Sequence, residues 1–167
     1  MVEGTDLGAA ISLTGSTCVV EAVDFVDNVQ KGVGAGVIFA AASNVTVSFA
    51  RFEQNRNLGL GAGVLAASAG SRVAFSHAQF LGNVADNQMG LVPDISESAT
   101  VPGVDAVSVS VIAADASAVS ATHSLFERNR GADVIAAGSA STVDRPSRYD
   151  EKSVKQTKGT LSSVVFL

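Results

Sequence analysis

Residues 32–55 read GVGAGVIFAAASNVTVSFARFEQN, and the frame of this stretch recurs along the chain. Its Gly-x-Gly-x-Gly-Val segment, Gly32–Val37, returns 27 residues later as Gly59–Val64. Four phenylalanines are each followed three residues later by an asparagine, and the first two of these pairs are also 27 residues apart. A fixed period of about 20 to 50 residues indicates one supersecondary unit stacked on its neighbours. The four pairs are Phe25/Asn28, Phe52/Asn55, Phe80/Asn83 and Phe126/Asn129.

Each unit holds two short runs rich in Val, Ile, Phe and Ala, a pattern typical of strands. In one of these runs Val45, Val47 and Phe49 alternate with Thr and Ser, which predicts that the three side chains share one face. A third segment, the Gly-rich stretch after each Asn, is expected to close the unit with tight corners. A helix around Ala40–Ala42 is the rival interpretation, and the Gly, Ser, Thr and Val residues in every candidate helix weaken it.

Three short strands with bends fit within 27 residues, so we expect an all-β fold, a parallel β-helix. Equivalent residues then stack about 4.8 Å apart, and the phenylalanines form an internal aromatic column. The asparagines, placed at a bend where a left-handed backbone suits them, form a ladder of side-chain amides. Hydrophobic residues reach 47% while aromatic residues are 5%, which suits a narrow core of Ala and Val.

The regular pattern breaks in two places. From Phe80 to Phe126 there are 46 residues, and the surplus over one unit falls in Asn87–Asp105. We expect this segment to be a lateral loop, because solenoids accept insertions at corners and such loops often line a binding face. The repeats predict a β-helix over residues 1–143 and a basic tail over 144–167. The tail is either a solvated linker or a contact arm.

At 167 residues the chain is one domain by the usual prior. It provides about four to five coils, whose open ends would expose strand edges. We therefore expect a fragment of a longer β-helix or a subunit whose ends are covered by partners. A net charge of −5 argues against a nucleic-acid partner. Neither a signal-peptide pattern nor an apolar run of about 18 residues is found, so no transmembrane segment is expected.

The Phe-x-x-Asn and Gly-Ala-Gly-Val units resemble the repeats of polymorphic outer-membrane proteins and, more broadly, those of the pectin-lyase-like superfamily. The second motif stands at Gly34–Val37 and Gly61–Val64 in place of the usual Gly-Gly-Ala-Ile, and it is missing after Asn83 and Asn129. The resemblance covers residues 8–143. It implies a right-handed β-helix with a structural or adhesive role at an extracellular or membrane-associated surface.

Enzymes of the β-helix class are the functional alternative, and they need carboxylates from adjacent coils at matching positions. No aligned column next to the phenylalanines holds two stacked acids, so no catalytic residue is assigned. Asp24 above Arg51 is expected to form an exposed ion pair worth less than about 1 kcal/mol. The three columns are Asp24, Arg51, Gln79 and Leu125; Val26, Glu53, Leu81 and Glu127; and Asp27, Gln54, Gly82 and Arg128.

The two histidines, His77 and His123, fall in one column, three residues before Phe. With coils about 5 Å apart, they are candidates to share a divalent metal with Asp94 or Asp105 as a third ligand. A stacked, uncharged pair is the favoured interpretation, because Ala and Phe fill this column in other coils. No metal or cofactor is assigned. Cys18 aligns with valines and is expected to be a buried apolar residue.

The residues thus favour a non-catalytic scaffold, adhesive surface or accessory subunit that contacts proteins through its coil ends, the loop 87–105 and the tail 144–167. A polysaccharide lyase or hydrolase is the main alternative, and a glycan-binding module lies between the two. The absence of Trp and the presence of a single Tyr, Tyr149, weaken both carbohydrate hypotheses, because sugar faces commonly stack on aromatic rings.

Overall fold

The computed structural model describes residues 3–4, 10–31, 33–86, 110–130, 133–137, 142–144, 148–149 and 160–161. These residues contain strands and no helix, and every strand pairing among them is parallel. The predicted loop Asn87–Asp105 lies outside the described residues, as does most of the predicted tail 144–167. The described part of the chain is therefore all-β with parallel sheets.

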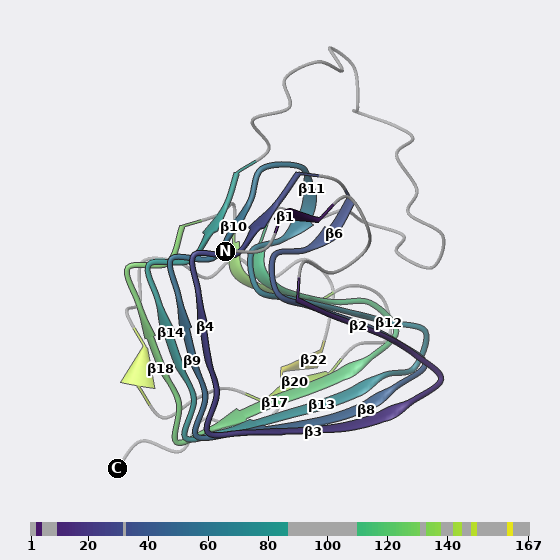
Figure 1. Ribbon diagram of the computed structural model, residues 1–167. Helices are drawn as coiled ribbons and strands as arrows, with labels where there is room; N and C mark the ends of the chain where they lie inside the picture. The colour runs from purple at the N-terminus through teal and green to yellow at the C-terminus, as the bar shows by residue number, and fades with distance from the viewer. Residues whose placement is uncertain are drawn as a thin grey trace.

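Three sheets form the walls of the molecule (Figure 1). The first contains β2 (Ile11–Thr14), β7 (Ile38–Ala41), β12 (Leu65–Ser68), β16 (Ser110–Ala114) and β19 (Asp133–Ala137). The second contains β3 (Thr17–Glu21), β8 (Asn44–Ser48), β13 (Arg72–Ser76), β17 (Ala118–Thr122), β20 (Thr142–Asp144) and β22 (Thr160–Leu161). The third contains β4 (Asp24–Val26), β9 (Arg51–Glu53), β14 (Gln79–Leu81), β18 (Leu125–Glu127) and β21 (Arg148–Tyr149).

Two smaller sheets carry the chain from the third wall back to the first (Figure 1). One contains β1 (Glu3–Gly4), β5 (Val29–Gln30), β10 (Arg56–Asn57) and β15 (Val84–Ala85). The other contains β6 (Val33–Ala35) and β11 (Leu60–Ala62). The Gly-rich segment thus forms two short strands where the sequence predicts one closing segment.

The chain visits the three walls in the same order again and again, and each such circuit is called a round. Residues 10–31, 33–58, 60–86 and 110–130 form rounds 1 to 4. Each round pairs in register with the one before it: Phe52 lies opposite both Phe25 and Phe80. Strands in the predicted tail also pair with these walls, because β21 pairs with β18 and β22 with β20. The predicted boundary at residue 143 stays a prediction.

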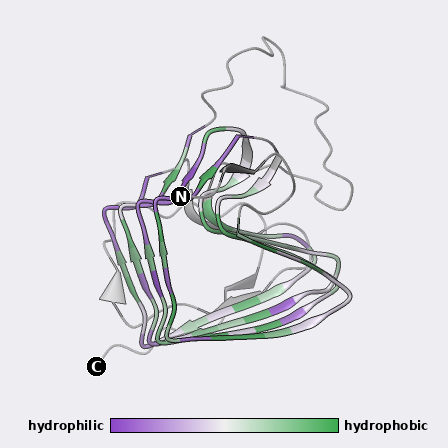
Figure 2. Ribbon diagram, in the orientation of Figure 1, coloured by the Kyte–Doolittle hydropathy of each residue, from purple (hydrophilic) through white to green (hydrophobic). Residues whose placement is uncertain are grey.

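The interior is filled by the inward-facing side chains of the three walls. Figure 2 shows hydrophobic positions recurring at the same level in neighbouring strands. Cys18 packs partly buried against this core, in register with Val45. The largest fully buried side chains include Phe52, Phe75, Phe80, Ile38, Leu65 and Ile112. Buried phenylalanines therefore contribute the largest side chains of the core, and Val, Ile, Leu and Ala side chains fill the rest of it.

Each corner between walls turns on a residue in the left-handed backbone region, and most of these residues are not glycine. The expected left-handed conformation of the ladder asparagines is wrong, because the residue before each Asn makes the turn. That arrangement leaves the Asn with its side chain pointing inward. The corner before the Asn ladder uses Asp27, Gln54, Gly82 and Arg128, and the corner between the second and third walls uses Ala22, Phe49, His77 and His123.

Phe49 departs from its predicted face. Strand β8 ends at Ser48, and Phe49 has a φ of 52°, so its side chain leaves the inward series of Val45 and Val47. The ring is 59% exposed. The alternation of apolar residues therefore predicts the face correctly only as far as the extended backbone continues.

Some glycines are required because the backbones of successive rounds approach closely. A β-carbon on Gly36 would overlap the carbonyl oxygen of Gly63, and one on Gly61 would overlap that of Gly34. Gly61 also has a φ of 130°, which side-chain-bearing residues rarely adopt. The recurring Gly-x-Gly-x-Gly motif thus lets the backbone of one round pass close to the next.

Candidate functional site

The four repeat phenylalanines form one internal column. Adjacent ring centroids are 5.1, 4.9 and 4.2 Å apart from Phe25 through Phe52 and Phe80 to Phe126, and the ring planes lie within 10° of parallel. Phe75 packs edge-on against the two central rings. All five rings are buried, so the column stabilises the fold and offers no surface to a ligand.

The asparagines form a continuous ladder beside the phenylalanines. The backbone N–H and the Nδ2 of Asn28 both donate to Oδ1 of Asn55, at 3.1 and 2.7 Å. Asn55 donates in the same way to Asn83, and Asn83 to Asn129. From the second rung on, each Nδ2 also donates to the carbonyl of the phenylalanine one round earlier. The ladder consumes the polar groups of its members and leaves little capacity for a ligand.

The histidines lie in an exposed stack with Phe49. The ring centroids of Phe49 and His77 are 4.9 Å apart, as are those of His77 and His123, and the two imidazole planes lie 6° from parallel. Imidazole lone pairs lie in the ring plane, so stacked rings direct their nitrogens side by side and not toward one ion at about 2 Å. The candidate third ligands Asp94 and Asp105 lie outside the described residues.

The described part of the chain contains no group of three or more His, Cys, Asp and Glu residues able to hold a metal. The rings of Phe49, His77 and His123 form a stack on an outer corner.

The predicted ion pair between Asp24 and Arg51 is wrong. The two residues do lie opposite each other in β4 and β9. However, Nη2 of Arg51 lies 2.5 Å from Oε2 of Glu53, two residues further along its own strand. Residues i and i+2 of a strand share a face, so the guanidinium reaches this carboxylate along its own strand.

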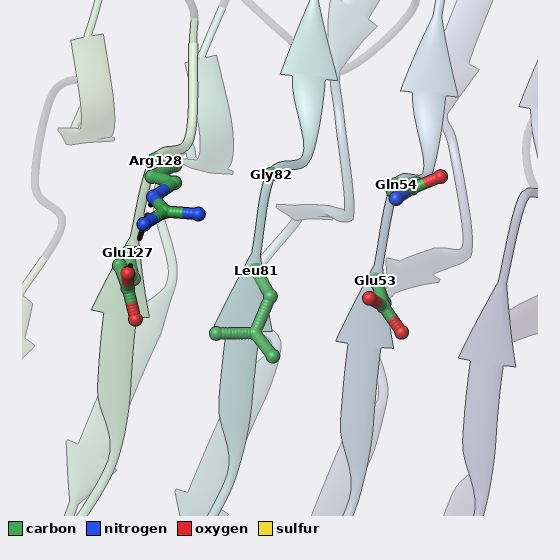
Figure 3. Close-up of a pocket in the computed structure, with 6 residues that line it drawn as sticks. All are labelled: Glu53, Gln54, Leu81, Gly82, Glu127 and Arg128. Carbon is green, nitrogen blue, oxygen red and sulfur yellow. Dashed lines mark ion pairs between the residues drawn. The ribbon is translucent and has the colours of Figure 1, made fainter.

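A hollow opens on the outer side of the third wall, where Gly82 interrupts a column of side chains (Figure 3). We call it the Gly82 hollow; its volume is about 220 Å³. A β-carbon added at Gly82 would meet only Cγ of Gln54, 3.9 Å away, so the missing side chain leaves the space open. The hollow is lined by Glu53, Gln54, Leu81, Gly82, Glu127 and Arg128.

Polar groups surround an apolar floor in the Gly82 hollow. Glu53 and Glu127 occupy the strand positions on either side of Leu81. Their Cα atoms are two rounds apart, about 9.6 Å at the usual strand spacing. Glu53 pairs with Arg51, and Glu127 with the adjacent Arg128 at 3.3 Å. The hollow therefore offers carboxylate, amide and guanidinium groups to hydroxyls or charges of a ligand.

The same geometry disfavours acid–base catalysis. A general acid at neutral pH needs a carboxyl that is kept protonated, usually by an apolar, water-excluded site. Both carboxylates of the hollow are partly exposed, and each is next to an arginine. Each carboxylate of the Gly82 hollow therefore lies beside a guanidinium at a partly exposed surface.

The sequence columns contained every residue of this hollow, but comparing adjacent rounds alone missed it. The two glutamates are separated by a full round, and the space between them depends on the one glycine in its column. Gly82 was the available signal, because Asp27, Gln54 and Arg128 all carry side chains there.

Comparisons of the chain with models of known families, with curated proteins and with solved structures find no match. Among the described residues, no helix has the length and apolar character needed to cross a membrane.

Proposed function

We propose that the rounds are coils of a right-handed parallel β-helix that serves as a non-catalytic scaffold, adhesive module or accessory subunit. It contacts other proteins through its ends, its outer corners, the loop 87–105 and the tail 144–167. The observation that carries this proposal is the ladder from Asn28 to Asn129. The buried polar side chains of that column form hydrogen bonds between adjacent rounds, as expected for a structural element.

The resemblance to polymorphic outer-membrane protein repeats supports the same role. Those repeats imply a right-handed coil and a surface-exposed, adhesive or structural function. We accordingly propose an extracellular or membrane-associated surface as the location. The exposed ring of Phe49 and the exposed side chain of Val19 are apolar contact points on the outside of the described rounds.

A polysaccharide assay tests the non-catalytic assignment. Purified protein is incubated with pectin and with alginate, and unsaturated products and reducing ends are measured over time. We expect no turnover. Turnover that is lost in Glu53→Gln or Glu127→Gln but kept in Glu21→Gln would contradict the assignment and make the Gly82 hollow an active site.

Glycan binding without catalysis is the second candidate, and the Gly82 hollow is the observation that favours it. Its polar rim over Leu81 suits sugar hydroxyls above an apolar ring face. Titration with pectin and alginate oligosaccharides by calorimetry tests this candidate. Gly82→Leu fills the hollow and abolishes any specific binding. Binding that is unchanged in this variant would exclude the hollow as the glycan site.

A further inference from the structure

Round 1 provides the terminal strand of each of the three walls, and the outer edges of these strands are open. β2, β3 and β4 each lie last in their sheet, and no described residue pairs with their outer sides. Across β3 and β8, Ala22 donates its N–H to Ser48, and Asn44 donates to Ser16. Alternate residues of a strand direct their backbone groups to opposite sides. The N–H groups that face the open side therefore belong to Thr17, Val19 and Glu21.

The side chains at this end are also uncovered on one side. Val23 is 37% exposed, while Ala50, Ala78 and Ser124, its equivalents in later rounds, are at most 3% exposed. In the first wall Ile11 and Leu13 are half-buried, although their equivalents in rounds 2 to 4 are fully or almost fully buried. These inward-facing positions lack the neighbour that the other rounds have.

The asparagine ladder and the serine ladder both end in round 1 with a side-chain oxygen that accepts no hydrogen bond from a described residue. Oδ1 of each later asparagine accepts from the round before it, whereas no described residue donates to Oδ1 of Asn28. The serine ladder behaves in the same way: Oγ of Ser43 accepts the N–H of Ser16, but no described donor reaches Oγ of Ser16. Round 1 therefore presents the acceptor half of an interface that is repeated inside the molecule.

One column of the third wall carries charges of opposite sign in its first and last described strands. The first end is acidic: three exposed carboxylates of round 1 have no ion-pair partner among the described residues, namely those of Glu21, Asp24 and Asp27. At the other end, Arg148 of β21 occupies the register position of Asp24.

We propose that the open edge of round 1 binds the last strands of a second copy of this chain, head to tail. This inference rests on the proposed β-helix scaffold and names its partner. In this arrangement β2, β3 and β4 of one copy continue the three sheets of the next in parallel. Arg148 of one copy then enters the column of Asp24 in the other. Joining two like ends would place the acidic residues against one another and pair the strands antiparallel.

Head-to-tail contacts do not close on themselves unless the rotation per subunit forms a ring, so the expected product is a filament or a ring. Sedimentation velocity of the full chain over a wide concentration range tests this. We expect concentration-dependent species whose masses are multiples of the 16.8 kDa chain. The degree of association should fall as the salt concentration is raised, because salt screens the charges at the contact. A protein that stays monomeric throughout, or that stops at a dimer, would overturn the proposal.

Val19→Pro is the decisive variant. It removes an N–H that faces the open side, and its side chain is exposed, so the hydrogen bonds between β3 and β8 remain. We expect association about a hundredfold weaker, because a proline both removes a ladder bond and crowds the added strand. Val19→Thr keeps the N–H and the branched shape, and it should associate like the native chain. Equal association of the two variants would refute the strand-edge contact.

A charge exchange tests the same contact without removing any backbone N–H group. Asp24→Arg and Arg148→Glu each place like charges at the interface and should weaken association about threefold, as expected for an exposed pair. Mixing the two variants restores opposite charges at every contact and should restore association. If mixing restores nothing, the head-to-tail register is wrong, and this test stands even if Val19→Pro fails to fold.

The outcomes separate this inference from the proposed function. A monomeric protein without polysaccharide turnover refutes the second-copy partner and leaves the scaffold role standing. Turnover in a protein that also associates refutes the non-catalytic role and leaves the contact standing.

Discussion

Round 1 and round 2 are built from the same pattern, yet they differ in how well the same positions are buried. Phe25 is 9% exposed and stacks on one ring, whereas Phe52 is fully buried between two. Val20 and Val47, which pair with each other, differ in the same direction. The difference shows that burial in this fold comes from the neighbouring rounds more than from the round itself.

This comparison has an energetic consequence. A side chain in a stacked fold loses contact with water only when rounds lie on both sides of it, so equal substitutions in different rounds should have unequal costs. Four paired substitutions test this, from the largest expected difference to the smallest.

Replacing the aromatic column residues should give the largest difference. Phe52→Ala empties a site enclosed by Phe25, Phe75 and Phe80, and we expect it to lower the free energy of unfolding by about 4 kcal/mol. Phe25→Ala should cost about 2 kcal/mol, because one side of its ring already lacks a stacking partner. Urea unfolding followed by circular dichroism measures both. Equal losses would mean that the column is not stacked as described.

The glycines give the next contrast. Gly36→Ala forces a β-carbon against the backbone of Gly63 and should cost about 2.5 kcal/mol. Gly15→Ala has open space around the new carbon, and only the left-handed backbone, with a φ of 58°, opposes it at about 1 kcal/mol. The thermal midpoints of the two variants provide the measurement. A milder effect at Gly36 than at Gly15 would show that the rounds do not approach so closely.

The asparagine ladder should show a smaller difference. Asn55→Ala removes two acceptor and two donor interactions and strands the buried backbone N–H of Asn28, so we expect a loss of about 2 kcal/mol. Asn28→Ala removes one side-chain donor bond, to Asn55, and should cost about 1 kcal/mol. Urea unfolding is again suitable. If Asn28 proves the more costly position, the ladder does not begin there.

The serine corner should give the smallest difference. Oγ of Ser43 accepts the N–H of Ser16 at 3.2 Å and donates to the carbonyl of Ala41 at 2.7 Å. Ser43→Ala should cost about 1 kcal/mol. Ser16→Ala should cost about half as much, because the Oγ of Ser16 makes a single hydrogen bond among the described residues, to the carbonyl of Thr14. Differential scanning calorimetry resolves shifts of this size. A neutral Ser43→Ala would remove the serine from the set of stabilising ladders.

Much of this architecture is readable from the sequence because a stacked fold repeats its constraints. Phe25 and Phe52 recur at one spacing since each must pack on the other, and the glycine motif recurs since two backbones must pass. The spacing also places His77 beside His123. The residues that recur in the sequence are the ones that contact their equivalents in the neighbouring rounds, and these contacts make up the core.

The remaining features depend on what does not repeat. Phe49 follows an extended run, and nothing in the alternation shows that its own backbone turns outward. Arg51 has two carboxylates within reach, and the choice of Glu53 depends on side-chain geometry within one strand. The Gly82 hollow arises because one column lacks a single side chain, a local exception that a search for recurring acids passes over.

The central claim is that the rounds pair in register and that the outer edge of round 1 is open. Hydrogen exchange measured at each backbone amide, in protein dilute enough to be monomeric, tests this claim most directly. We expect alternation along β3 and into Ala22, the residue after it: fast exchange at Val19 and Glu21 and slow exchange at Val20 and Ala22, because only the latter two direct their N–H groups toward β8. In β8, which is paired on both sides, every amide should exchange slowly. Alternation that is absent from β3, or equally present in β8, would contradict it.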